Sequence, residues 1–178
     1  MTDNLPPAPP GIAPAVQRTV QFFEHLRPSD LSDLGQHYAP HAVFKDPFNE
    51  VRGLAAIEGV FRHMFVSLHE PHFIVTQRVV QGPHCFLTWD FVFRFQRFSP
   101  SQWQTVRGAS HLVYDEQGLI TLHRDYWDAA EELYAKLPLL GVLMRALRRR
   151  LSTPQLPQPL PSSRTSYAPS RRCWRRNG

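Results

Sequence analysis

The sequence predicts an α+β fold in which N-terminal helices pack on one face of a twisted antiparallel sheet. Apolar residues recur largely at helical spacing over residues 14–68, whereas strand-like alternation dominates residues 72–127. Turn signals divide the second part into four strands: Gly82-Pro83, Ser99-Pro100-Ser101 and Asp115-Glu116-Gln117-Gly118. Helices that cover one face of such a meander can leave a pocket beneath them.

Three helices are predicted before most of the sheet. The first has Pro14 in its first turn and an apolar stripe made of Val16, Val20, Phe23 and Leu26. The second is capped by Ser29 or Asp30 and ends at Pro40, with Leu31, Leu34 and Tyr38 on one face. After a short strand at 42–45, Gly53 opens a third helix with apolar positions Ile57, Val60, Phe61, Met64, Phe65 and Leu68.

The four strands are predicted at about residues 72–81, 84–98, 102–114 and 119–127, and a basic amphipathic helical region follows at 128–151. The second strand has one apolar face, formed by Cys85, Leu87, Trp89, Phe91, Phe93 and Phe95. Phe86, Asp90 and Arg94 lie on its other face. One layer of helices cannot cover so many apolar side chains, so we expect a homodimer through the outer face of the sheet.

Composition predicts one domain between two tails. Of 178 residues, 42% are hydrophobic and 12% aromatic, which is enough for a core. We expect a disordered lead at 1–12, the domain with its C-terminal helical extension at 13–151, and a disordered tail rich in Pro, Ser and Arg at 152–178. Residues 145–178 hold nine arginines and no acid, whereas the rest has eleven Lys and Arg against fifteen Asp and Glu. A nucleic-acid or anionic-membrane partner is therefore only weakly suggested, by the basic C-terminus alone.

Several classes of function lack support in the sequence. It has no phosphate-binding glycine loop and no Gly-x-Ser-x-Gly elbow. Cys85 and Cys173 indicate neither a disulfide nor a thiolate metal site, and we expect no metal and no cofactor. The absence of a long apolar stretch and of a basic leader predicts a cytoplasmic protein.

The segment Tyr38 to Gly53, YAPHAVFKDPFNEVRG, places one carboxylate between two aromatic residues. Asp46 lies between Phe44 and Phe48, just before a turn. An aspartate in a poorly hydrated pocket accepts a proton more readily, which would make Asp46 a general base. Asp-Pro is also a common turn opener, in which the carboxylate binds the backbone amides that follow. Both interpretations remain open at this stage.

Two motifs together resemble one family. They are YAPHAVFKDPFNEVRGLAAIEGVF, which is similar to Tyr-Ala-x-x-Ala-x-x-x-Asp-Pro followed by Gly and a helix, and YDEQGLITLHRDYW near the end of the domain. The chain resembles the nuclear transport factor 2-like superfamily in its SnoaL-like and ketosteroid-isomerase-like branch, over about residues 14–128. This resemblance implies a cone-shaped fold of helices against a curved sheet, with Asp46 as the general base.

The resemblance also implies where the chain departs from the isomerases. The family's oxyanion-stabilising tyrosine falls on Phe22, whose side chain has no hydrogen-bond donor. The family's acid falls on Ser110, whose hydroxyl is a neutral donor. This argues against steroid isomerisation. The last strand would turn His123, Asp125 and Trp127 towards the cavity; His123 could act as acid or base, and Asp125 could orient it or take that role itself. A purely structural pairing of the two is the alternative.

Two functions remain open from the sequence. The first is a small-molecule-binding pocket protein of undetermined activity, whose apolar ligand contacts five residues: Phe22, Phe44, Phe48, Ser110 and Trp127. The second is an acid–base enzyme of isomerase, cyclase or dehydratase type acting on an apolar carbonyl compound, with Asp46 as base and His123 and Asp125 as further catalytic candidates. A weaker candidate is Asp90 with Arg94, which match poorly the spacing in relatives that hydrolyse epoxides.

Overall fold

The computed structural model describes residues 12–96 and 101–132. Residues 1–11 of the predicted lead, most of the C-terminal helical region and the basic tail lie outside these residues. Ile12, predicted as the end of the lead, instead begins α1 and is buried. The chain forms, in order, α1 (Ile12–His25), the 3-10 helix η1 (Pro28–Gln36), β1 (Tyr38–Lys45), β2 (Glu50–Arg52), α2 (Leu54–Ser67), β3 (Leu68–Gln81), β4 (His84–Phe95), β5 (Trp103–Tyr114), β6 (Ile120–Tyr126) and α3 (Ala129–Glu132). None of the described helices is long and apolar enough to cross a membrane.

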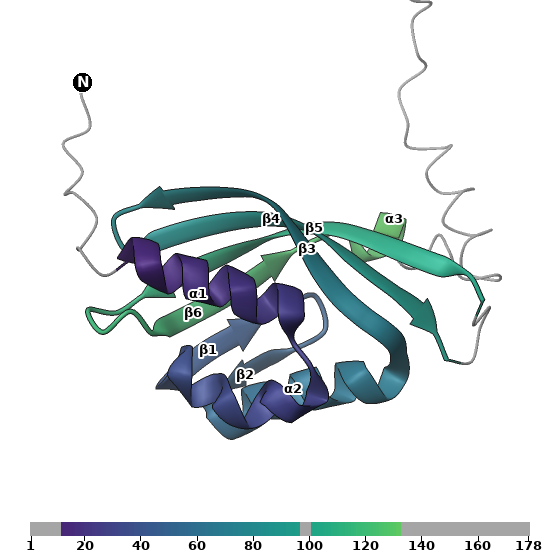
Figure 1. The fold of residues 1–178 in the computed structure, drawn as a ribbon, viewed down its shortest axis with the longest axis horizontal. Helices are drawn as coiled ribbons and strands as arrows, with labels where there is room; N and C mark the ends of the chain where they lie inside the picture. Colours follow the sequence, from purple (N-terminus) through teal and green to yellow (C-terminus); the bar gives the residue numbers. More distant parts are fainter. Residues whose placement is uncertain (1–11, 97–100, 133–178) are drawn as a thin grey trace, which may run out of the picture.

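The six described strands form one curved sheet in the order β2-β1-β6-β5-β4-β3 (Figure 1). Strands β3 to β6 make the antiparallel meander that the turn signals predict. β1 pairs antiparallel with β2 but parallel with β6, where Phe44 lies opposite His123. The sheet is thus antiparallel except at the β1–β6 pairing, which the sequence did not indicate because contact between two segments distant in sequence leaves no local signal.

The second predicted helix differs most from expectation. It is a 3-10 helix that ends at Gln36, and Tyr38 to Pro40 belong to β1. Serine, aspartate and glycine are weak helix formers, so this segment has little intrinsic tendency to continue as an α-helix. Pro40 lies within the register shift between Tyr38 and Val43, where a strand tolerates a residue without an N–H group.

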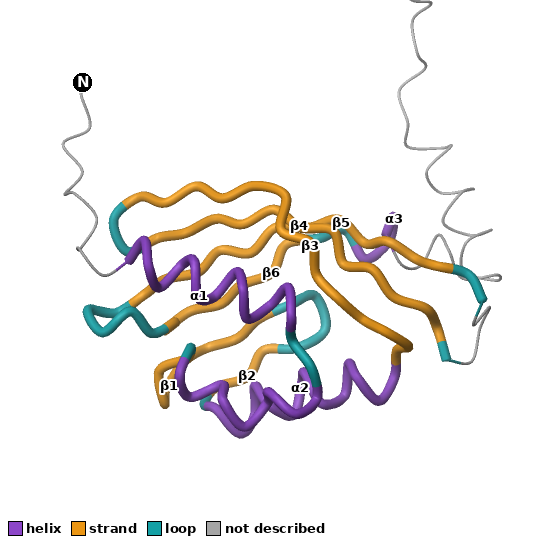
Figure 2. The backbone as a smooth tube through the Cα atoms, viewed as in Figure 1, coloured by secondary structure: helices purple, strands orange, loops and turns teal. Residues whose placement is uncertain are grey.

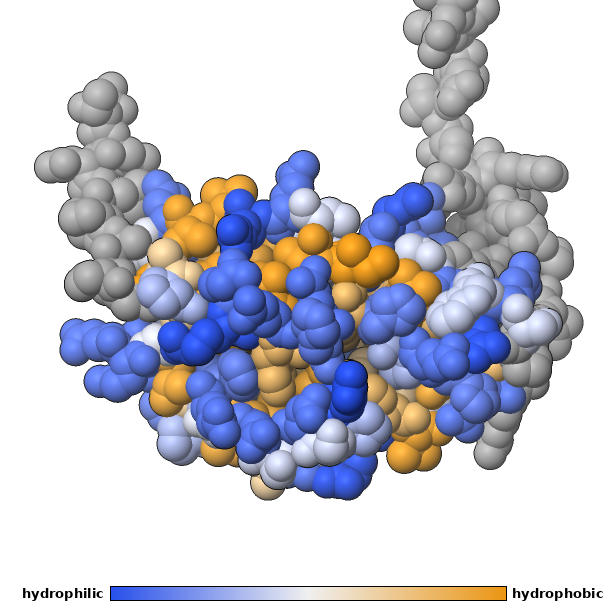
Figure 3. Space-filling model, in the orientation of Figure 1, coloured by the Kyte–Doolittle hydropathy of each residue, from blue (hydrophilic) through white to orange (hydrophobic). Residues whose placement is uncertain are grey.

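The helices cover one face of the sheet, as predicted. α1 packs against β3, and α2 packs against η1, β1, β2 and β3 (Figures 1 and 2). The inner face of β4 is buried at Cys85, Leu87, Trp89 and Phe93. On the helix-covered side most surface side chains are hydrophilic, with apolar ones between them (Figure 3). The core thus lies between the helices and the concave face of the sheet.

The outer face of the sheet carries the alternate side chains of the same strands. Asp90 lies 3.9 Å from Arg107, and Arg94 binds Glu70 at 2.6 Å. Both Asp90 and Arg94 therefore point away from the space beneath the helices, and the weak candidate formed by this pair does not line it. Apolar side chains are also exposed on this face: Ile74, Val79, Phe86, Trp103 and Tyr126.

Candidate functional site

A cavity of about 370 Å³ lies between α2 and the inner face of the sheet. Most of its lining is apolar and much of it aromatic: Phe44, Phe48, Val60, Phe61, Met64, Leu68, Phe73, Trp89, Phe91, Phe93, Phe95, Val106 and Trp127. Its polar lining residues are Asp46, Asn49, His63, Ser67 and Asp125. A largely apolar cavity with a few polar groups is the usual form of a small-molecule site.

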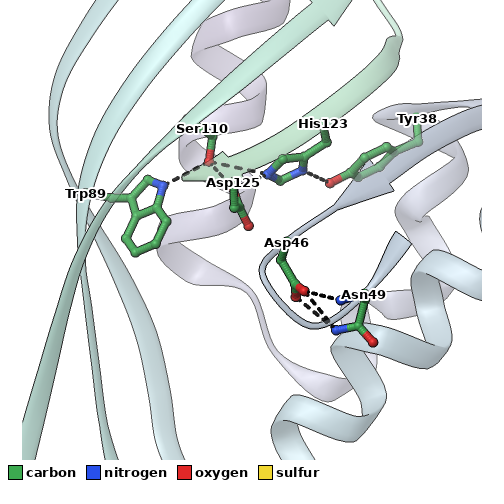
Figure 4. Close-up of polar contacts among 7 residues, drawn as sticks. All are labelled: Tyr38, Asp46, Asn49, Trp89, Ser110, His123 and Asp125. Atoms are coloured by element: carbon green, nitrogen blue, oxygen red, sulfur yellow. Dashed lines mark hydrogen bonds and ion pairs between the residues drawn. The ribbon is translucent and has the colours of Figure 1, made fainter. Parts of the chain in front are cut away.

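Asp46 lines this cavity from the turn between β1 and β2. Its Oδ1 accepts hydrogen bonds from the backbone N–H groups of Phe48 at 2.7 Å and Asn49 at 2.6 Å. The side-chain amide of Asn49 donates to Asp46 Oδ2 at 3.0 Å (Figure 4). These contacts hold the turn, as expected if Asp46 has the structural role of a turn opener. They also occupy the carboxylate that the catalytic hypothesis needs, so the role of Asp46 as a base stays a prediction.

Asp125 lines the same cavity from β6 and is held by two donors (Figure 4). The Ser110 hydroxyl donates to Asp125 Oδ1, and His123 Nε2 lies 2.9 Å from the same oxygen. Ser110 in turn accepts a hydrogen bond of 2.9 Å from the Trp89 indole N–H. The Asp125 side chain is 14% exposed, and in the described part of the chain no hydrogen bond reaches its Oδ2. One oxygen is thus anchored and the other is available to a ligand.

His123 is buried behind Asp125 and contacts Tyr38 on its other side. The Tyr38 hydroxyl lies 2.6 Å from His123 Nδ1 (Figure 4). Burial raises the pKa of Tyr38 well above its usual value, with a further contribution from the charge of Asp125. Tyr38 therefore keeps its proton at neutral pH, and its hydroxyl can donate a hydrogen bond to Nδ1 of a neutral imidazole, which leaves Nε2–H to face Asp125. The row of hydrogen bonds from Tyr38 through His123 thus orients the Asp125 carboxylate.

The predicted ligand contacts lie in different places. Phe44, Phe48 and Trp127 line the large cavity, with the Phe48 and Trp127 rings 5.4 Å apart and edge to face. Ser110 lines a small adjoining cavity of about 20 Å³ together with His123 and Asp125.

Phe22 is not among the described residues that line either cavity. Its ring stacks on His37, 4.0 Å away. Its neighbour Phe23 lines the small cavity instead and lies 5.4 Å from the His123 ring. Phe22 therefore lines neither space, because consecutive helix residues point in different directions.

The sequence profile of the SnoaL-like domain family matches residues 19–123, more than half of the chain. The chain belongs to the SnoaL-like domain family. No curated protein matches this SnoaL-like chain in sequence. The resemblance to the nuclear transport factor 2-like superfamily is thus confirmed.

Solved structures share the fold of this SnoaL-like domain. An LEH-like epoxide hydrolase from M. tuberculosis superimposes with a TM-score of 0.58 at 17% identity, covering 78% of this chain and 98% of the other. A Shewanella denitrificans protein described as a SnoaL-like polyketide cyclase gives 0.57 at 17% identity, with 71% and 99% covered. A hypothetical protein with a ketosteroid isomerase-like fold from Catenulispora acidiphila, solved in complex with trimethylamine, gives 0.57 at 16% identity, with 67% and 88% covered. At these identities the likeness establishes the fold alone.

Three residues with polar contacts at the site were not identified from the sequence: Tyr38 and Trp89, in the hydrogen-bonded row that leads to Asp125, and Asn49, in the turn that holds Asp46. Tyr38 was expected on a helix face, and Trp89 was identified only as an apolar side chain; Asn49 was expected to contribute its backbone alone. A tryptophan or tyrosine at a core position usually finds a partner for its polar atom, so Trp89 carried a usable signal. The hydrogen-bond partners themselves could not be predicted from the sequence, because they come from different strands.

Within residues 12–96 and 101–132, no group of three His, Cys, Asp or Glu side chains could hold a metal ion.

The SnoaL-like domain is expected to lose stability in alkali. Burial raises the pKa of Cys85 from 9.0 to about 11 and raises the pKa values of Tyr38 and Tyr114 above 10.0. The unfolded chain loses these protons at lower pH than the folded one. The free energy of unfolding should therefore be level up to about pH 9 and fall as pH rises further, by up to about 1.4 kcal/mol per pH unit for each proton involved.

Urea unfolding at several values between pH 8 and pH 10.5 measures this slope. A Tyr38→Phe variant removes one titrating group, so its free energy of unfolding should fall less steeply than that of the wild type over the same range. An unchanged free energy of unfolding across this range in the wild type would contradict the expectation.

Proposed function

We propose that this protein binds a small, largely apolar molecule in the cavity between α2 and the sheet. The proposal rests chiefly on one observation: a cavity of about 370 Å³ whose apolar wall is interrupted by two carboxylates, Asp46 and Asp125. Such a volume suits one small organic molecule. The C. acidiphila protein of similar fold was solved with the small molecule trimethylamine, which supports the idea that the fold can hold such ligands.

Blocking the cavity tests the proposal. Met64 on α2 lines the cavity, whereas Val66 on the same helix is 67% exposed. A library of small apolar compounds, including amines and carbonyl compounds, is screened by the rise in melting temperature. A ligand at 100 times its Kd stabilises a protein by about 2.7 kcal/mol. Met64→Trp is expected to abolish this stabilisation, and the control Val66→Trp to preserve it. Absence of any binding compound, or equal stabilisation of the Met64→Trp variant, would count against the proposal.

A second candidate function is acid–base catalysis, with Asp125 in place of Asp46 as the main group. The observation that favours it is the anchoring of one Asp125 oxygen by Ser110 and His123 while the other is available to a ligand. A carboxylate held in one orientation can accept a proton from a bound molecule or return one. The Tyr38–His123 contact supports that orientation from behind. Isomerisation, cyclisation and dehydration of an apolar carbonyl compound all need such a group.

A homodimer through the outer face of the sheet is a further proposal. Phe86 is 47% exposed there, stacks on His111 with ring centroids 4.4 Å apart, and lies opposite Val79, which is also exposed. A second copy that covers these side chains would remove apolar surface from water. We expect a dimer in sedimentation velocity at micromolar concentration, and a monomer after Phe86→Lys.

Val66→Lys is the matched control for this experiment, because it adds the same charge at an exposed apolar position on α2 instead of the sheet. It should leave the dimer intact. A wild-type protein that sediments as a monomer would contradict the proposal, as would equal loss of dimer in both variants. We also propose a cytoplasmic location. The basic tail, on which the suggested nucleic-acid or anionic-membrane partner depends, lies outside the described residues.

A further inference from the structure

The charges in the large cavity are of one sign. Asp46 and Asp125 are acidic, and no lysine or arginine is among the described residues that line it. His63 is the one lining residue that could become positive; it lies exposed on α2 and is within 3.3 Å of the Ser67 hydroxyl. The cavity lining therefore carries negative charge when the two carboxylates are ionised.

Nearby basic side chains are engaged elsewhere. Lys45 and Arg124 line an open depression next to the cavity, and Asp46 and Asp125 line this depression as well as the cavity. Lys45 forms an ion pair with Glu50, and the Arg124 guanidinium lies 4.9 Å from the centroid of the Tyr126 ring. Neither belongs to the described lining of the cavity.

Aromatic rings stand beside the two carboxylates. Phe48 is two residues after Asp46 in the turn, and Trp127 is two residues after Asp125, just beyond the end of β6. Their rings meet edge to face at the cavity wall. The faces of aromatic rings carry partial negative charge and attract organic cations, most strongly where water is excluded. The carboxylates and the rings thus favour the same kind of ligand group.

From this arrangement we infer that the ligand of the cavity is an apolar amine that carries a positive charge, as a protonated or quaternary ammonium group. The inference rests on the proposed function and names its ligand class. A neutral ligand would displace water from two carboxylates and offer them no compensating charge, and an anionic ligand would add repulsion. An ammonium group between Asp46, the Asp125 Oδ2 and the Phe48–Trp127 rings supplies the missing charge, while its apolar remainder fills the aromatic part of the cavity.

Two probes of equal shape and different charge test the inference. Benzyltrimethylammonium is a cation, and neopentylbenzene is its neutral isostere, with carbon in place of nitrogen. Binding of each to the wild-type protein is followed by tryptophan fluorescence, since Trp89 and Trp127 line the cavity. The cation is expected to bind at least tenfold more tightly. Equal or tighter binding of the neutral probe would overturn the inference and leave the proposed function standing, whereas failure of both probes to bind would count against both.

Charge-removing variants locate the source of the preference. Asp125→Asn and Asp46→Asn are each expected to weaken cation binding severalfold and to leave the affinity for neopentylbenzene nearly unchanged. Asp90→Asn is the matched control, because it removes the same charge from the outer face of the sheet. An equal loss in Asp90→Asn would attribute the preference to the overall charge of the protein and overturn the inference. The comparison of the two probes on the wild type holds even if one variant does not fold.

Discussion

Asp125→Asn is expected to lower turnover by about 10²–10⁴-fold on any substrate that this protein isomerises, cyclises or dehydrates. An amide has nearly the shape of a carboxylate, and its oxygen can still accept from Ser110 and His123, so the side chain should keep its place. It cannot take up the proton that the reaction moves. The loss should therefore appear mainly in kcat, with KM changed much less.

Two further variants separate catalysis from positioning. Asp46→Asn is expected to cost far less than Asp125→Asn, because the Asp46 carboxylate is occupied by Phe48 and Asn49. Tyr38→Phe removes the hydrogen bond that fixes His123 and should shift the pH profile of kcat without abolishing activity. A larger loss in Asp46→Asn than in Asp125→Asn would assign the base to Asp46. Full activity in Asp125→Asn would exclude it as the acid–base group.

Gly108→Ala is expected to lower the free energy of unfolding by about 1–3 kcal/mol, the usual range for overpacking a core. Gly108 lies directly opposite Trp89 in the sheet, and a Cβ atom there would come within 2.6 Å of Cζ2 of the indole ring. Trp89 is buried and donates a hydrogen bond to Ser110, so the ring has little freedom to move aside. Because Trp89 also lines the cavity, ligand affinity should fall together with stability.

Gly59→Ala is the matched control for this prediction. Gly59 lies inside α2, and an added Cβ atom meets nothing within 4 Å. The same substitution should there raise the free energy of unfolding by about 0.5–1 kcal/mol, since alanine loses less backbone entropy in a helix. Urea denaturation measures both changes. A Gly108→Ala variant as stable as the wild type would show that the Trp89 side chain can move away at little cost.

The sequence by itself determined the fold class and most of its elements. Helical spacing identified α1 and α2, and the turn signals divided the meander into β3 to β6, because these features depend on neighbours in the chain. The motifs around Asp46 and His123 also identified the superfamily. Period-two alternation placed His123 and Asp125 on one face of the last strand, which turns towards the cavities.

Only the tertiary structure decided which polar groups work together. The alternation of β6 could not show that Tyr38 would reach His123, since that contact depends on the parallel pairing of β1 with β6 and on a register shift near Pro40. It could not show that Ser110, on β5, would donate to Asp125 and accept from Trp89, on β4. Helical spacing placed Phe23 on the apolar face of α1, but it could not show that the Phe23 ring would lie beside the small cavity and His123. Each of these facts is a long-range contact, and local patterns in a sequence specify the faces of elements but not their partners.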